Sequence, residues 1–321
     1  MPLPLIPALI AAGSLLAGGY GVKKGLDARD DLERAESIGK DAKRRHEESI
    51  ASLEKERENT NRHFVNLGKL KAHIFSHQIK RLVNEVKKRK KSRSKLEGYK
   101  ESIEKLDLPN LEKMVLNSLE IETGLLSGAA SGALAGLGAY GSVGLLASAS
   151  TGTAIASLSG AAATNATLAW LGGGALSAGG LGMAGGTAIL GGFVAGPAIA
   201  ITGLMMASKA EEALTKARAY EANVDEKIAE IEGMRLILQG LQANANEMTH
   251  TLKKLVPFFD EAADSLSSDE ASFLRLLAVG KGLKAVLETP ILEKDGSATE
   301  QLESKLRTKI RHAGVLEYEG Q

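Results

Sequence analysis

Two histidines four residues apart are the clearest candidates for chemistry in this chain. His73 and His77 lie on one face of a predicted helix, and two imidazoles at that spacing can bind one metal ion. No carboxylate or third histidine accompanies them, so we expect a solvent-facing pair and no metal site. The chain has no cysteine, which excludes thiolate metal ligands, disulfides and a cysteine nucleophile.

Other motifs for catalysis and cofactor binding are missing from the sequence. A phosphate-binding loop needs Lys and then Ser or Thr directly after its last glycine, and no such pair occurs. Residues 172–174 are all glycine, but no acidic residue follows about 20 positions later, as a dinucleotide site requires. Serine and threonine are plentiful, yet none has a recognisable general base. The sequence therefore predicts a protein that is not an enzyme, with no catalytic residue, cofactor or metal.

The rest of the chain is organised around residues 123–208, which contain no Asp, Glu, Lys, Arg or His. A hydrocarbon core about 30 Å thick takes about 20 apolar helical residues to cross, so this uncharged segment has length for two to four spans. We expect a hairpin of roughly 124–147 and 182–207 with a semi-polar connection. Permanent insertion and insertion after a change of environment are both compatible with this pattern.

Glycines recur at intervals of four in the uncharged segment. Small residues at this spacing let two helices approach closely in lipid, where no hydrophobic effect drives them together. The predicted glycine zipper for membrane-helix packing consists of Gly124, Gly128, Gly132, Gly136, Gly182, Gly186, Gly192 and Gly196. Trp170 precedes a run of glycines and is predicted to be an interfacial aromatic residue at a turn.

A basic helical arm, residues 25–122, precedes the uncharged segment. It contains a run of five cations that we expect to contact an anionic membrane surface. A solvated helix face and nucleic-acid binding are the alternatives, and the few nearby aromatic residues argue against the second. The run consists of Lys87, Lys88, Arg89, Lys90 and Lys91.

A second arm, residues 209–256, follows the uncharged segment. Apolar residues at threes and fours between Val224 and Leu255 predict a coiled coil. Because a hairpin brings its two ends together, the basic arm folded back antiparallel is the expected partner. Pro257 is expected to end this helix.

The two ends of the chain complete the predicted organisation. Residues 257–321 form a small helical region with helices at 271–287 and 300–312. Residues 1–24 are an apolar anchor or interfacial segment, and the lysines that follow place its C-terminal end in the cytoplasm if it spans the membrane.

The predicted fold is all-α, with long antiparallel coiled-coil arms flanking a Gly/Ala-rich transmembrane hairpin. This architecture resembles the α-helical pore-forming toxins of the cytolysin A and xenorhabdolysin type. The resemblance implies a soluble helical stalk that sequesters an apolar hairpin and then releases it to oligomerise in a bilayer. Residues 151–170 and 186–197 also look like a block in uncharacterised bacterial membrane proteins with coiled-coil arms and a glycine zipper.

These features predict a protein that self-associates in a bacterial inner membrane and perturbs or permeabilises it. The expected partners are an anionic lipid bilayer, further copies of the chain and a cytoplasmic protein, and the arms are expected in the cytoplasm. A soluble form before insertion is compatible with the pattern. The alternative is a constitutive membrane-anchored coiled-coil scaffold that presents its arms to a cytoplasmic partner.

Overall fold

The computed structural model describes residues 20–91, 103–104, 106–125, 131–140, 210–267, 269–292 and 298–315. These residues are almost entirely helical and include no strand beyond an isolated bridge between Leu292 and Ala298, which confirms the predicted all-α class. The helices, in chain order, are α1 (Tyr20–Ile74), the π-helix η1 (Phe75–Ile79), α2 (Lys80–Lys91), α4 (Leu108–Leu125), α5 (Ser131–Tyr140), α10 (Ala210–Asp264), α11 (Glu270–Leu287) and α12 (Leu302–His312).

The described residues fall into two compact units. Unit 1 holds residues 20–53 and 210–233, and unit 2 holds the described residues of 54–140 and 234–315. Helices α1 and α10 are each 55 residues long and contribute to both units.

Small side chains form the helix contact in unit 1. Ala35 of α1 packs with Ala213 and Ala217 of α10. One heptad further along α1, Ala42 packs with Tyr220 and Val224. Alanine at these positions lets the two helices approach closely.

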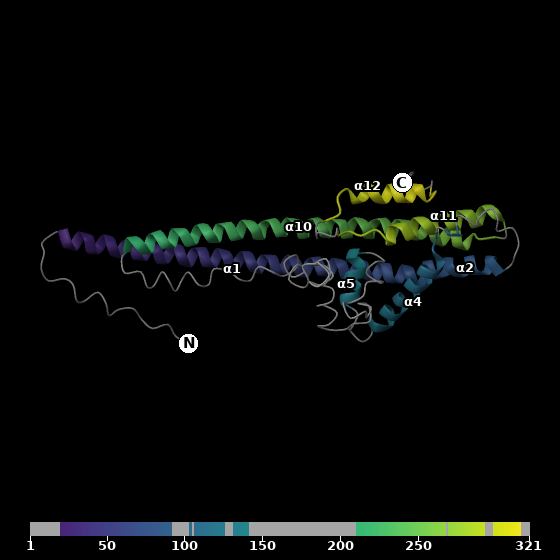
Figure 1. Ribbon diagram of the computed structural model, residues 1–321, viewed down its shortest axis with the longest axis horizontal. Helices are drawn as coiled ribbons and strands as arrows, with labels where there is room; N and C mark the ends of the chain where they lie inside the picture. The colour runs from purple at the N-terminus through teal and green to yellow at the C-terminus, as the bar shows by residue number, and fades with distance from the viewer. Residues whose placement is uncertain are drawn as a thin grey trace. The chain divides into compact units, whose positions relative to one another are not determined.

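The α1 and α10 helices run in the same direction in each unit (Figure 1). In unit 1, the advance from Ala35 to Ala42 along α1 matches an advance from Ala217 to Val224 along α10. In unit 2 the contacts with α10 advance in the same way, from Thr60 of α1 with Gln242 to Arg81 of α2, which follows α1 through η1, with Asp264. The predicted antiparallel arrangement of the arms is therefore wrong.

The parallel direction has a simple physical explanation. The antiparallel prediction assumed that a hairpin returns the chain directly to the end where it left. The chain between α2 and α10 has more residues than α1, so it is long enough for α10 to begin beside the N-terminal part of α1 instead. Opposite net charge on two helices favours their contact but does not set their direction.

The three-and-four rhythm of the second arm forms a buried stripe on α10, as predicted. The buried members are Val224, Ile231, Leu238, Leu241, Ala245, Met248, Leu252 and Leu255. The helix does not end at Pro257, however, but continues to Asp264. Phe259 and Ala262 are fully buried beyond the proline, and this packing offsets the lost backbone hydrogen bond.

Helices α11 and α12 pack against each other in unit 2, close to their predicted bounds. The Asp269 carboxylate caps α11 by accepting a hydrogen bond from the Ser272 backbone N–H at 2.8 Å. Gly314 follows α12 with φ of +89°, a left-handed conformation that glycine adopts without strain.

Within the described ranges, no helix combines the length and apolar character needed to cross a bilayer. The predicted membrane hairpin lies largely in residues 141–209, outside the described part of the chain.

Candidate functional site

The one described helix that lies wholly within the uncharged segment, α5, crosses α1 at very short range in unit 2. A Cβ atom built on Gly68 of α1 would lie 1.9 Å from the carbonyl oxygen of Leu134 in α5. A Cβ built on Gly138 of α5 would lie 2.1 Å from the carbonyl oxygen of Phe64 in α1. Because the obstructing atoms belong to backbone, no side-chain rotation can relieve such an overlap. Glycine at both positions is therefore what permits this crossing.

Apolar side chains fill the space around the crossing. Leu134 and Leu137 of α5 are fully buried, and Phe64 and Leu67 of α1 are 3% and 1% exposed. Burial of a leucine side chain contributes about 1.5–3 kcal/mol, so this contact holds α5 on unit 2 by hydrophobic packing as well as by shape.

Lys71 of α1 is fully buried beneath the end of α5. Its Nζ donates a hydrogen bond to the carbonyl oxygen of Gly138 at 3.3 Å. Removal of the ammonium group from water lowers the pKa of Lys71 from 10.5 to about 7. A buried lysine of this kind changes charge near neutral pH.

Two carbonyl groups at the C-terminal end of α5 accept hydrogen bonds from outside the helix. The last carbonyl groups of a helix have no partner within it. Lys71 donates to the Gly138 carbonyl, and the backbone N–H of Ile291 donates to the Ala139 carbonyl at 2.9 Å. The partial negative charge of the helix end also favours the lysine when it is protonated. Together, the glycine crossing, Lys71 and Ile291 form what we call the α5 dock.

The predicted zipper glycines fall partly within the described residues. Gly124 lies in α4, while Gly132 and Gly136 lie in α5. The remaining predicted positions, together with the predicted interfacial Trp170, lie outside the described residues: Gly128, Gly182, Gly186, Gly192 and Gly196. The packing of these glycines in a membrane therefore stays a prediction.

Sequence reasoning missed both glycines of the α5 dock. Gly138 breaks the interval of four on which the zipper rests. Gly68 stands alone inside a charged helix, where a glycine costs about 1 kcal/mol relative to alanine. The presence of Gly68 despite this cost could have indicated a close backbone contact, because an isolated glycine inside a helical pattern often has a packing reason.

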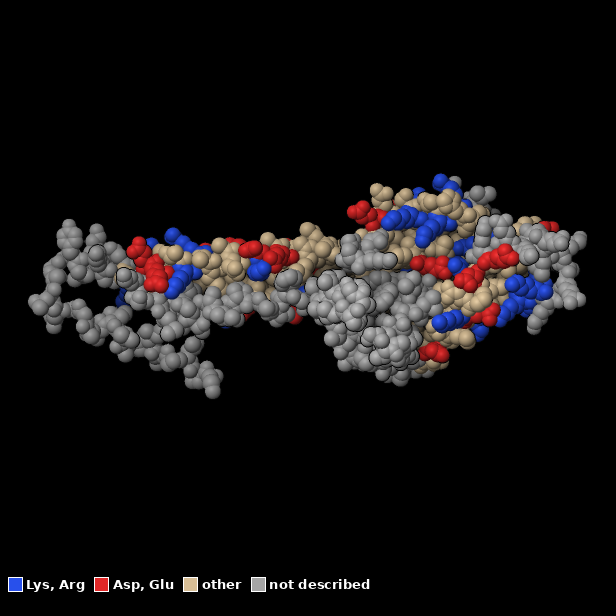
Figure 2. Space-filling model, in the orientation of Figure 1, with Lys and Arg blue, Asp and Glu red and all other residues tan. Residues whose placement is uncertain are grey.

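The predicted basic run lies at the end of α2, where Figure 2 shows Lys and Arg side chains gathered on the surface. Lys87 forms a 2.8 Å ion pair with Glu112, and Lys88 forms one with Glu85. Both lysines are exposed, and ion pairs of this kind contribute little to stability. Lys90 is exposed too, whereas the Lys91 side chain lies outside the described residues.

Arg89 differs from its neighbours because it contacts α11 and the turn before it. Its guanidinium carbon lies 4.4 Å from the ring centroid of the buried Phe273, and the same side chain donates to the Ser267 carbonyl. The fold therefore uses Arg89 internally, while Lys87, Lys88 and Lys90 are exposed to solvent.

This difference gives a testable prediction. Arg89→Ala is expected to lower the free energy of unfolding by about 1–2 kcal/mol, because it removes a cation–π contact and a charge-assisted hydrogen bond. Lys90→Ala is expected to change stability by less than about 0.5 kcal/mol while weakening binding to anionic vesicles. Chemical denaturation and vesicle sedimentation of both variants check this. Equal stability of the two variants would contradict the internal role of Arg89.

The histidine pair differs from its sequence-based prediction in one respect. His73 and His77 are exposed, as expected, but a carboxylate does accompany them. Glu122 of α4 lies beside the pair, far away in sequence, because α4 packs against η1. The prediction that no carboxylate joins these histidines is wrong.

Comparison with known protein families, with characterised proteins and with solved structures finds no match for the chain, so its function has to be argued from its own residues.

Proposed function

We propose that this protein inserts its uncharged segment, residues 123–208, into an anionic bacterial inner membrane and permeabilises it. The inserted segment self-associates through its glycine faces, and the arms stay on the cytoplasmic side. A segment of this length without one charged residue supports the proposal, because it can form spans without a buried charge.

The observation that carries the proposal is the α5 dock. Helix α5 is apolar along its length, and unit 2 provides it with a matched glycine crossing, buried leucine contacts and partners for its end. A helical body that holds part of an apolar segment in this way can keep it out of water until a membrane is present.

The surface of α2 supports attraction to the bilayer. Each Lys or Arg near an anionic surface contributes about 1 kcal/mol of attraction. The ion pairs of Lys87 and Lys88 are exposed, so both lysines can exchange their carboxylate partners for lipid phosphate groups at little cost.

Dye release from vesicles tests the proposal. The protein is expected to release dye from anionic vesicles and much less from zwitterionic ones. The Gly128→Leu and Gly132→Leu double variant is expected to reduce release, because leucine prevents close helix approach in lipid. Gly233→Leu is the matched control, since Gly233 lies on exposed α10 surface outside the uncharged segment. Unchanged release by the double variant would remove the zipper from the mechanism.

A constitutive membrane-anchored scaffold is the second candidate. It is favoured by Leu236 and Ile237, which are 69% and 47% exposed on α10 and provide an apolar surface for a cytoplasmic partner. Extraction with carbonate and then detergent separates the two candidates. A soluble species that becomes carbonate-resistant only after a stimulus supports the inserting protein, whereas a protein that always needs detergent supports the scaffold.

A further inference from the structure

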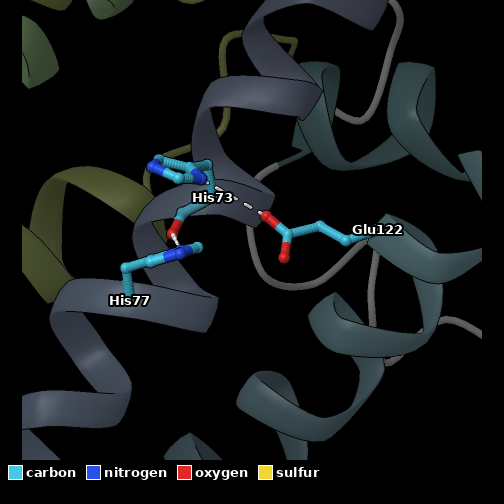
Figure 3. A group of neighbouring side chains, drawn as sticks. All are labelled: His73, His77 and Glu122. Atoms are coloured by element: carbon cyan, nitrogen blue, oxygen red, sulfur yellow. Dashed lines mark hydrogen bonds and ion pairs between the residues drawn. The ribbon is translucent and has the colours of Figure 1, made fainter.

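Three side chains from separate elements converge on the surface of unit 2 (Figure 3). His73 of α1, His77 of η1 and Glu122 of α4 each offer a ligand atom, and these atoms all lie within 4.8 Å of one another. His73 Nδ1 lies 3.5 Å from a Glu122 carboxylate oxygen, and the two imidazole centroids are 3.9 Å apart. Two imidazoles and a carboxylate thus face one small volume.

The backbone orients the imidazole of His77. Its Nδ1 lies 3.0 Å from the His73 carbonyl oxygen, and the Ser76 hydroxyl donates to the same oxygen at 3.0 Å. The Ser76 hydroxyl oxygen also lies 2.8 Å from Nδ1. Because a carbonyl only accepts, the contact with the His73 oxygen favours the neutral tautomer that carries its proton on Nδ1 and a lone pair on Nε2. Metal-binding histidines commonly donate their second ring N–H to a backbone carbonyl in this way.

The π-helix η1 begins two residues after His73. A π-turn shifts the backbone hydrogen-bond register, and such turns often occur at functional sites. Phe75 and Ile79 of η1 are fully buried and hold the turn in place. The His73 carbonyl then accepts from two side chains, Ser76 and His77.

The donor set selects the class of metal. Two imidazoles and a carboxylate suit Zn²⁺ and related transition metals, whereas Mg²⁺ and Ca²⁺ prefer oxygen ligands alone. With zinc–ligand bonds of about 2.0–2.1 Å, tetrahedral ligand atoms lie about 3.4 Å apart. The 3.5 Å separation of His73 Nδ1 from the Glu122 carboxylate already matches. Because the ligand atoms lie within 4.8 Å of one another, His77 needs to approach the other two by at most about 1.4 Å. Because His73 and His77 are exposed, water can complete the coordination.

We propose that His73, His77 and Glu122 form a Zn²⁺ site that joins α4 to α1. Glu122 directly precedes Thr123, the first residue of the uncharged segment, so a bound ion fixes the start of that segment beside α1. Helix α4 packs against both η1 and α2, which limits the movement needed for binding. Zinc binding does not depend on membrane insertion.

Titration calorimetry with Zn²⁺ on the full chain, purified without a polyhistidine tag, tests this site. Wild-type protein is expected to bind one ion. Glu122→Gln and His77→Ala are each expected to weaken binding at least about tenfold, because three protein ligands become two. His250→Ala is the matched control, an exposed histidine on α10 whose removal leaves binding within about twofold.

A second measurement separates ligand loss from misfolding. Circular dichroism without metal is expected to be the same for wild type and Glu122→Gln, a conservative change at the protein surface. Zinc is expected to raise the melting temperature of wild type and His250→Ala but not of the two ligand variants. Absence of one-ion saturable binding, or equal affinity in wild type and His77→Ala, would overturn the site and leave only the His73–Glu122 ion pair.

Discussion

Gly68→Ala is expected to displace α5 from α1 and destabilise its docked state by about 2 kcal/mol. The new Cβ would lie 1.9 Å from the Leu134 carbonyl oxygen, and overpacking of this kind costs about 1–3 kcal/mol or more. Hydrogen–deuterium exchange of α5 peptides measures the effect, since a loss of about 2 kcal/mol speeds exchange through local opening about thirtyfold.

Gly233→Ala provides a closely matched control for this change. Gly233 also lies inside a 55-residue helix, but nothing lies within 4 Å of a Cβ built there. This control is expected to stabilise the protein by up to about 1 kcal/mol through helix propensity alone. The close crossing would be contradicted if Gly68→Ala behaved like Gly233→Ala and left α5 exchange unchanged.

Lys71→Met is expected to stabilise the protein at pH 7 and below by several kcal/mol. The shift of the Lys71 pKa from 10.5 to about 7 corresponds to roughly 5 kcal/mol of unfavourable burial of the charged form. Loss of the hydrogen bond to Gly138 offsets about 1 kcal/mol of that gain. Methionine fills a similar volume and carries no charge.

The pH dependence distinguishes this explanation from a simple packing effect. Between about pH 7 and 10.5 the unfolded chain binds the Lys71 proton and the folded chain does not, so the free energy of unfolding rises with pH in that window. Below about pH 7 both states are protonated and the full penalty remains. The advantage of Lys71→Met is therefore expected to be greatest at or below pH 7 and to vanish near pH 10.5.

Denaturant unfolding at several pH values, with Lys69→Met as the control, measures this difference. Lys69 lies two residues before Lys71 on α1 and is exposed, so its replacement is expected to give no pH-dependent gain in stability. A constant difference between Lys71→Met and wild type across the pH range would show that Lys71 does not titrate in its buried position.

Helix existence and buried faces could be predicted from the sequence because they follow from local periodicity. The apolar rhythm of α10 is reproduced as a buried stripe, and the C-terminal helices start within two residues of their expected positions. The end of α10 could not be predicted in this way. Pro257 is a local helix breaker, but burial of Phe259 on unit 2 outweighs its cost.

Long-range features could not be predicted because local patterns do not specify them. The direction of the α1–α10 pair depends on the path of the intervening chain. Glu122 lies beside the histidines only because α4 packs on η1. Gly138 is a packing residue only because α5 crosses α1 at Gly68. Each of these contacts joins residues that are distant in sequence.

The central claim is that α5 leaves its dock on unit 2 and enters lipid. The chain has no cysteine, so Ala135→Cys on α5 gives a single position for a fluorescent label. The measurement is quenching of that label by vesicles whose acyl chains carry a quencher. The label is predicted to be unquenched in solution and quenched on anionic vesicles in step with dye release. Dye release without quenching would contradict the claim. Vesicle binding that produces no quenching at any pH tested would contradict it too.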